Sequence, residues 1–335
     1  MKRVGNIMPQ IADVDNLMLA FCKARRGKQY KAEVIDYSAN VLENIMSLRE
    51  RMLNETLSVG NYHYFEIYDP KQRRICAASF EERVVHHAIM NVCKERFERH
   101  LIFDTYATRE NKGVYAAIDR VREAICKYPY VAKLDVRKYF DSINHQVLKT
   151  KLRRIFKDQK LLRLFDTIID SYESSPSTGI PIGNLTSQYF ANYYLSDLDH
   201  YIKEKLHVPV YVRYMDDMLL FAKSRLELVD MVAKIRAYAE NILLLELKPA
   251  QILNVNGGVS FLGYSLAPHR IWLNRRSKLR FVSKFRIYDS LLRCGEWNEE
   301  QFIQHVRPLL AFAEKAYTMN LRERVCRRYA VGGWE

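Results

Sequence analysis

The feature that most constrains the fold is a pair of adjacent carboxylates, Asp216 and Asp217, between two apolar, strand-like runs. The runs read Tyr211-Val-Arg-Tyr-Met and Met218-Leu-Leu-Phe. Burying a carboxylate costs several kcal/mol unless a cation compensates its charge. We therefore predict a tight hairpin that presents both carboxylates to a metal ion. A solvated Asp-Asp turn is the more frequent meaning of such a pair taken alone.

A third carboxylate in a similar setting favours the metal site. Tyr130-Val-Ala-Lys-Leu-Asp135-Val136 is a strand pattern that ends in an acid. Two strand-borne acids and a neighbouring acid supply the oxygen ligands that hard divalent cations prefer. Two such cations about 4 Å apart stabilise the attacking and leaving oxygens of an in-line phosphoryl displacement.

The charge balance points to a polyanionic partner. Lys and Arg outnumber Asp and Glu, which leaves a net charge of +14. The 22 Tyr and 15 Phe are interleaved with these cations, and bases stack on aromatic rings, so nucleic acid is favoured. An excess of Lys on an ordinary surface is the alternative.

The cysteines and the hydropathy indicate a cytoplasmic protein. No Cys-x-x-Cys pair occurs, which argues against a zinc site and a disulfide framework and fits a reducing compartment. The N-terminus lacks a signal-like apolar run, and no stretch approaches the ~20 apolar residues of a membrane span. The six cysteines are Cys22, Cys76, Cys93, Cys126, Cys294 and Cys326.

Apolar periodicity predicts a mixed α+β chain. Helices are expected twice within 13–56 and then over 80–101, 114–127, 145–156, 161–174, up to 206, 226–241 and through 275–335. Strands are expected at 62–68, 73–78, 130–136, 243–247, 252–255, 259–265 and 271–273, and in both arms of the hairpin within 211–221. Asn256-Gly257-Gly258 predicts a hairpin turn.

Three loops carry groups suited to phosphate. The hairpin with Arg73 is basic and could close over a phosphate. Its sequence is equally consistent with a solvated edge strand whose charges prevent pairing with other chains. Arg109 and Lys112 precede Gly113 and a helix N-terminus. A Gly/Pro loop from 175 to 188 runs into another helix and lets the backbone approach a ligand. The alternative is the start of an ordinary capped helix. With the three acids, this order of segments predicts nucleotidyl transfer on a polyanion.

At these motifs the sequence resembles a reverse transcriptase. Tyr214-Met-Asp-Asp217 is similar to the family's catalytic hairpin, and Leu134-Asp-Val-Arg-Lys-Tyr-Phe-Asp-Ser-Ile143 to its first acid motif. Gly179-Ile-Pro-Ile-Gly-Asn-Leu-Thr-Ser-Gln188 most resembles the enzymes of diversity-generating retroelements, as does the stretch Tyr106–Ala117. Group II intron and retroviral relatives typically carry Gln where Ile182 stands and Pro where Gln188 stands.

The resemblance implies a right-hand polymerase fold with fingers, palm and helical thumb, the palm being an antiparallel sheet packed on helices. Fingers are expected over 1–130. The palm is expected over 131–273, with inserted finger helices at about 145–178 and the primer grip. The thumb is expected over 274–335.

The resemblance also implies roles for individual residues. Asp135, Asp216 and Asp217 would be catalytic and would hold two Mg²⁺ ions (or Mn²⁺), together with the Val136 carbonyl. Phe140 would be the steric gate that selects dNTPs. The other implied dNTP-site residues are Arg73, Arg109, Lys112, Ile182, Gly183 and Gln188, and the implied primer grip is Phe261, Leu262, Gly263 and Tyr264.

The implied function is error-prone, adenine-mutagenised copying of a structured template-repeat RNA into cDNA. An RNA/DNA hybrid, dNTPs and a basic oligomeric accessory variability protein are the implied partners, and no membrane is expected. Alternatives are another bacterial reverse transcriptase (from a retron, a group II intron-derived element or phage defence) and a non-catalytic RNA-binding scaffold. Related enzymes often carry a Lys slightly later than Lys248, so the donor of a proton to pyrophosphate stays open.

Overall fold

The chain divides into two compact units, each assembled from three separated stretches of sequence. A computed structural model describes residues 3–68 and 72–329, except for the side chain of Arg73. Unit 1 comprises Met1–Arg109, Asp135–His207 and Ala233–Pro249. Unit 2 comprises Glu110–Leu134, Val208–Val232 and Ala250–Glu335. Asp135 therefore follows directly on a segment of the other unit, while Asp216 and Asp217 belong to unit 2.

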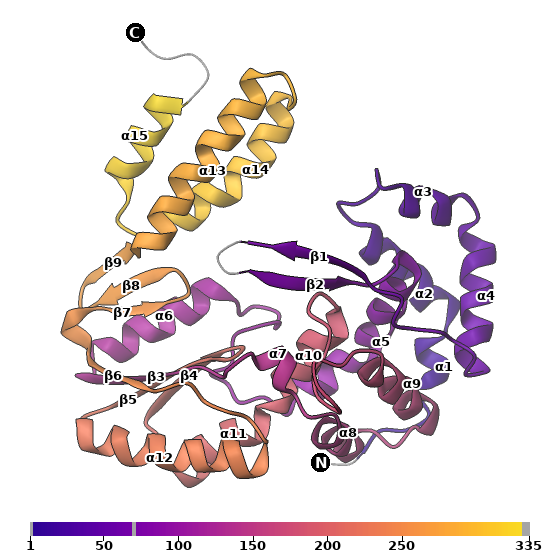
Figure 1. Ribbon diagram of the computed structural model, residues 1–335, viewed down its shortest axis with the longest axis horizontal. Coiled ribbons are helices and arrows are strands. Elements are labelled where there is room, and N and C mark those ends of the chain that lie inside the picture. Colours follow the sequence, from indigo (N-terminus) through magenta and orange to yellow (C-terminus); the bar gives the residue numbers. More distant parts are fainter. Residues whose placement is uncertain (1–2, 69–71, 330–335) are drawn as a thin grey trace. The chain divides into compact units, whose positions relative to one another are not determined.

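Unit 1 begins with a cluster of helices around α5 (Phe80–Glu98), which packs most extensively on α2 (Val14–Arg25). The Ser79 side chain caps the N-terminus of α5. Asp158 anchors the N-terminal residues of this unit. Its carboxylate accepts hydrogen bonds from the backbone amides of Ile7 and Met8, at 2.7 and 2.9 Å. The helices are α1 (Met8–Ile11), α2 (Val14–Arg25), α3 (Ala32–Ala39), α4 (Val41–Leu53) and α5 (Phe80–Glu98) (Figure 1).

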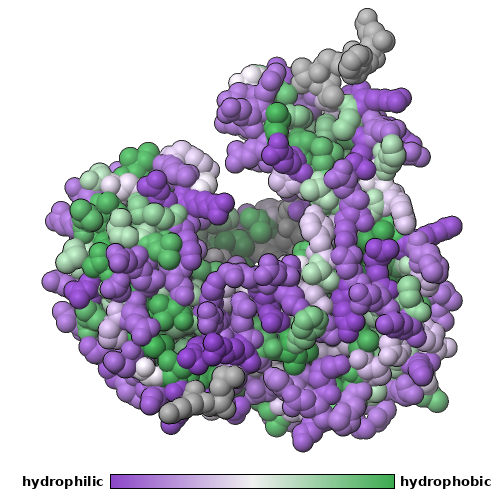
Figure 2. Space-filling view, turned by 180° about the vertical axis from the view of Figure 1, so that it is seen from behind, coloured by the Kyte–Doolittle hydropathy of each residue, from purple (hydrophilic) through white to green (hydrophobic). Residues whose placement is uncertain are grey.

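The apolar pattern of the N-terminal helices is only partly buried. Val34 and Ile45 lie in the core, whereas Ile35, Leu42 and Met46 are 55%, 66% and 48% exposed. Figure 2 shows hydrophobic residues gathered on this part of unit 1. No helix among the described residues has the length and apolarity to cross a membrane.

The basic hairpin is confirmed, and it also lies in unit 1. β1 (His63–Ile67) pairs antiparallel with β2 (Arg73–Ala77), in the register His63↔Ala77 to Ile67↔Arg73. The other helices of unit 1 are α7 (Tyr139–Ser142), α8 (His145–Ile155), α9 (Gln159–Asp170), α10 (Leu185–Tyr194), α11 (Ser196–His200) and the π-helical turn η1 (Tyr201–Lys205).

Unit 2 contains an antiparallel four-stranded sheet in the order β4-β5-β3-β6. Its strands are β3 (Tyr130–Leu134), β4 (Val210–Tyr214), β5 (Asp217–Ala222) and β6 (Gln251–Asn254). Helix α6 (Val114–Ile125) packs on β4. Helix α12 (Arg225–Ile242) starts in unit 2, and its residues from Ala233 onward belong to unit 1.

A second sheet of unit 2 corrects one strand prediction and one turn prediction. It has the order β7-β8-β9, from Val259–Phe261, Tyr264–Ala267 and Arg270–Leu273. The run 259–265 is thus two strands. Asn256-Gly257-Gly258 is not a hairpin turn, because β6 pairs with β3 and β7 pairs with β8, with the 3₁₀ turn η2 (Val255–Gly257) between them. The tail forms α13 (Arg275–Arg293), α14 (Glu299–Glu314) and α15 (Met319–Tyr329).

The predicted strand 243–247 was also wrong. Only Leu247 makes a strand-like pair, an antiparallel bridge to Val136. Leu244 has a positive φ of 55°, which interrupts an extended run. The bridge nevertheless matters, because it places the chain up to Lys248 beside the segment that begins at Asp135.

Candidate active site

The Asp-Asp hairpin forms as predicted. Tyr214 pairs with Asp217, so Met215 and Asp216 are the two turn residues, and Met215 has a φ of 56°. Two-residue hairpins require such left-handed backbone because it matches the twist of the flanking strands. Asp216 is thus at the tip of the hairpin, and Asp217 is the first residue of β5.

A buried arginine braces this turn. Arg213 has no exposed surface, and its Nη1 donates to the Met215 carbonyl at 3.0 Å. A buried charged group must be compensated by hydrogen bonds or by opposite charge, so its position is strongly specified. Arg213 was not predicted from the sequence, although a lone cation in an otherwise apolar strand was the available signal.

Lys133 connects the second acid of the hairpin to the small sheet. Its Nζ lies 3.7 Å from Asp217 Oδ1 and donates to the Ser260 carbonyl at 3.1 Å. Lys133 is on β3, directly opposite Leu219 of β5, in the register that ends with Leu134↔Met218. A positive charge therefore already faces the Asp217 carboxylate within unit 2.

The first acid lies in unit 1, immediately after β3. Lys248 Nζ donates to Asp135 Oδ2 at 2.6 Å, whereas Asp135 Oδ1 is buried and has no hydrogen-bond partner. A buried carboxylate oxygen without a donor suits a cation ligand, so Asp135 fits the predicted metal site. Within 3–68 and 72–329, no three His, Cys, Asp or Glu side chains are grouped closely enough to hold a metal ion.

Two adjacent aromatic residues of α7 have different environments. Tyr139 is 3% exposed, and its hydroxyl donates to the Ala191 carbonyl. Phe140 is only partly buried, and its carbonyl accepts from the Ile180 amide at 2.9 Å. The core role therefore belongs to Tyr139, which leaves the Phe140 ring available for the predicted gate.

The Gly/Pro loop is attached to the basic hairpin by its backbone. The Cys76 amide of β2 donates to the Ile182 carbonyl at 2.8 Å. Gly183 has a φ of 129°, and a Cβ there would lie 2.8 Å from the Cys76 carbonyl oxygen. Only glycine satisfies both conditions. Gln188, one helical turn later, receives a 3.5 Å contact from the Thr108 hydroxyl.

Side chains fix the other end of this loop. Asn184 is the N-cap residue of α10 but makes no capping hydrogen bond with its side chain, and its amide donates to the Tyr62 hydroxyl at 3.3 Å. The buried Thr186 hydroxyl lies 3.1 Å from His86 Nδ1, and His86 Nε2 lies 3.4 Å from Glu82. Tyr62 and the Glu82–His86–Thr186 chain are positioning residues that the sequence did not reveal.

The close approach at Gly183 gives a stability prediction. Gly183→Ala should destabilise the protein by about 1–3 kcal/mol, because alanine must adopt a strained φ and push on the β2 backbone. Urea unfolding should show a lower midpoint with an unchanged slope. Gly257→Ala is the control, since nothing lies within 4 Å of a Cβ there. Equal midpoints for both variants would contradict this account of the loop.

The match to known proteins decides the family. Residues 69–266 match the reverse transcriptase (RNA-dependent DNA polymerase) family, which is more than half of the chain. This protein belongs to the reverse transcriptase family. Its fold class is thereby the right-hand polymerase fold predicted from the sequence, and it carries an RNA-directed DNA polymerase domain.

Individual relatives of this reverse transcriptase are distant. Protein YkfC of Escherichia coli is 23% identical over 295 residues, covering 72% of this chain and 77% of YkfC. A putative COX1/OXI3 intron 1 protein of Saccharomyces cerevisiae is 21% identical, covering 61% of this chain but only 26% of the yeast protein. The structure of apo telomerase from Candida tropicalis superposes with a TM-score of 0.50 at 12% identity, covering 82% of this chain and 60% of that chain.

The predicted primer grip of this reverse transcriptase is a tight hairpin anchored on the tail helices. Leu262 and Gly263 form its two-residue turn, with φ of 47° and 89°. The Tyr264 hydroxyl donates to the Phe312 carbonyl at 2.7 Å, and their rings lie 4.7 Å apart. A Cβ on Gly263 would meet Phe312 and Ser277 at 2.8 Å.

The predicted triphosphate cations are dispersed over both units. Arg109 of unit 1 donates through Nη1 to the Ile102 and Thr105 carbonyls and to the Thr105 hydroxyl, at 2.8, 3.1 and 2.7 Å. Lys112 belongs to unit 2. Arg73 is the first residue of β2, and its side chain is not among the described parts of the structure.

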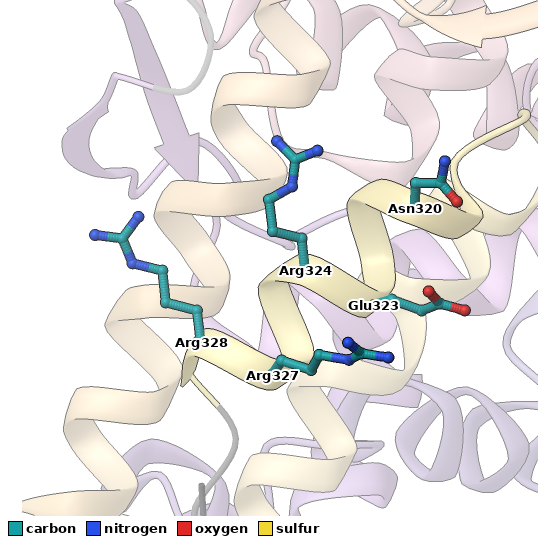
Figure 3. A pocket seen from close by; sticks show the side chains of 5 residues that line it. All are labelled: Asn320, Glu323, Arg324, Arg327 and Arg328. Carbon is teal, nitrogen blue, oxygen red and sulfur yellow. The ribbon is translucent and has the colours of Figure 1, made fainter. Parts of the chain in front are cut away.

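Unit 2 also contains a pocket on α15 (Figure 3). Arg324 and Arg328 extend from one side of the helix in this view. The lining residues are Asn320, Glu323, Arg324, Arg327 and Arg328. Three guanidinium groups beside one carboxylate make this a strongly basic part of the predicted thumb, and it contains none of the predicted catalytic residues.

Proposed function

We propose that this reverse transcriptase makes error-prone, adenine-mutagenised cDNA for a diversity-generating retroelement. The observation that supports this subtype is the apolar residue Ile182. Ile182 lies in the loop that is held against β2 by the Cys76 amide and by the close approach of the Gly183 backbone. A polar side chain at this position can hydrogen-bond the incoming nucleotide or its neighbours, whereas isoleucine cannot. The free-energy gap between correct and incorrect pairs should therefore be small.

The proposed reaction is attack of a primer 3′-hydroxyl on the α-phosphate of a dNTP, with pyrophosphate leaving. Asp135, Asp216 and Asp217 would hold divalent cations, and bound Mg²⁺ supplies charge stabilisation at the attacking and leaving oxygens. The Asp135 Oδ1 atom, buried and without a hydrogen bond, supports this assignment. Phe140 would exclude a 2′-hydroxyl, and the hairpin 261–264 would position the primer end.

The partners we propose follow from this chemistry. A structured RNA template, the RNA/DNA hybrid and dNTPs are polyanions, in keeping with the net charge of +14. A basic oligomeric accessory protein belongs to the proposed retroelement and is tested by adding it to the extension assay. A catalytically silent RNA-binding scaffold is the contrary proposal, which the acid variants described below address.

The loop residue gives a direct test of the subtype. Ile182→Gln should lower misincorporation opposite template adenine about 5-fold, because one new hydrogen bond to a correctly placed nucleotide is worth about 1 kcal/mol. The measurement is primer extension on a defined RNA template, followed by sequencing of the cDNA. Ile182→Leu keeps the apolar character and is the matched control. An adenine error rate that Ile182→Gln leaves unchanged would refute the assigned role of this residue.

A second candidate function is copying for another bacterial retroelement. The similarity to the yeast intron protein favours a group II intron-derived enzyme, and a retron or phage-defence enzyme is the other alternative. The DNA around the coding sequence discriminates between them. A pair of repeats that differ at adenines, next to an accessory gene, supports the diversity-generating assignment, and their absence supports the second candidate.

A further inference from the structure

The side chain of Lys248 forms an ion pair with Asp135, the first of the predicted metal ligands. Its Nζ lies 2.6 Å from Asp135 Oδ2, with the two side chains 38% and 28% exposed. Both residues belong to unit 1. Lys248 is also the only lysine between residues 243 and 254.

Backbone contacts between residues 135–137 and 246–248 bring the Lys248 and Asp135 side chains together. The Lys248 amide donates to the Asp135 carbonyl at 2.9 Å, and the Arg137 amide donates to the Glu246 carbonyl at 2.9 Å. Between them, Val136 and Leu247 form an antiparallel bridge. Residues directly opposite each other in such a ladder have neighbouring side chains on the same face. The ammonium is therefore held next to the carboxylate by register, and not by a chance rotamer.

A second cation, Arg236, holds the segment that carries Lys248. Arg236 of α12 donates through Nη1 to the Leu247 carbonyl at 2.8 Å and through Nη2 to the Lys248 carbonyl at 3.0 Å. These bonds fix the backbone at the bridge residue Leu247 and at Lys248 itself. The aliphatic stem of Lys248 can still rotate, so its ammonium is the movable part of the pair.

We propose that Lys248 is a built-in counter-cation of Asp135, which neutralises this carboxylate in the metal-free enzyme and competes with divalent cations for it. The inference rests on the proposed role of Asp135 as a metal ligand. The ammonium neutralises the charge that would attract a divalent cation and repels a cation that approaches either oxygen of Asp135, Oδ2 next to it or Oδ1, which lacks a donor. Lys248 therefore lowers the affinity of the free enzyme for divalent ions, and once displaced it is a mobile cation close to the site of phosphate chemistry.

Metal binding without substrates tests this competition. We expect Lys248→Met to bind Mn²⁺ with a Kd about 5-fold lower than the unaltered protein, because an ion pair of this exposure contributes on the order of 1 kcal/mol. Free Mn²⁺ can be followed by electron paramagnetic resonance. Lys248→Arg keeps the positive charge and should retain the weaker affinity. An Mn²⁺ affinity of Lys248→Met equal to or below that of the unaltered protein overturns the proposal.

Two further variants separate this inference from the proposed function. Lys149→Met removes a lysine with the same 2.6 Å approach to a carboxylate, that of Asp170, and should leave Mn²⁺ binding unchanged. Asp135→Asn should weaken Mn²⁺ binding and should cancel the effect of Lys248→Met in the double variant. If Asp135→Asn binds Mn²⁺ as the unaltered protein does, the metal site itself is misassigned. If Asp135→Asn weakens binding while Lys248→Met changes nothing, only the competition is refuted.

Discussion

Asp216→Asn should abolish DNA synthesis, with a loss of at least ~10³-fold in the rate of dNTP incorporation. The substitution keeps the size of a side chain at the tip of a two-residue turn and removes the negative charge that a cation needs. Loss of one metal-bound carboxylate removes about 4 kcal/mol or more of transition-state stabilisation. The measurement is single-turnover primer extension on an RNA template with Mg²⁺.

Two controls make the result specific. Asp230→Asn changes an exposed acid of α12 in the same unit and should leave the rate within about 2-fold, as expected for a surface substitution. Asp216→Asn should keep the thermal unfolding midpoint and the affinity for RNA/DNA hybrid. Appreciable synthesis by folded Asp216→Asn would contradict the assignment and leave the RNA-binding scaffold as the better description.

Phe140→Ala should let the enzyme use ribonucleotides. Removing the ring opens the space for a 2′-hydroxyl, so the preference for dNTPs over rNTPs should fall on the order of 10²-fold. The change should appear mainly in kcat/KM for rNTPs, measured by incorporation of a single nucleotide. Phe140 is only partly buried, so the substitution should cost less stability than truncation of a core aromatic.

The neighbouring aromatic residue is the matched control. Tyr139→Phe removes the buried hydrogen bond to the Ala191 carbonyl and should lower stability by about 1 kcal/mol without changing sugar selection. If Phe140→Ala discriminates against ribonucleotides as strongly as the unaltered enzyme, the steric gate lies elsewhere.

The hairpin with Asp216 and the strand before Asp135 could be predicted because each combines a strong strand pattern with acids that an apolar setting does not tolerate unpaired. The same reasoning failed at Asn256-Gly257-Gly258. Dipeptide preferences describe the local turn, but they do not tell whether the flanking strands pair with each other or with different sheets. The actual turn is Leu262-Gly263, where Phe312 and Ser277 leave no room for a Cβ on the glycine.

The contacts that fix the site residues could not be predicted from sequence, because they join distant segments. Lys248 is 113 residues from Asp135, and Thr186 is 100 residues from His86. The local sequence around each of these residues does not indicate which distant residue it contacts. Arg213 differs in this respect, since a cation inside an apolar strand already required a nearby acceptor.

The proposed function requires that Asp135, Asp216 and Asp217 together hold a pair of divalent cations at the primer end. The most direct measurement is anomalous scattering from Mn²⁺ in crystals of the enzyme with an RNA template, a chain-terminated DNA primer and the next dNTP. We expect two peaks about 4 Å apart, each within about 2.2 Å of a carboxylate oxygen of Asp135 or Asp216. Peaks bound to other residues, with Asp135 still paired to Lys248, would contradict this assignment.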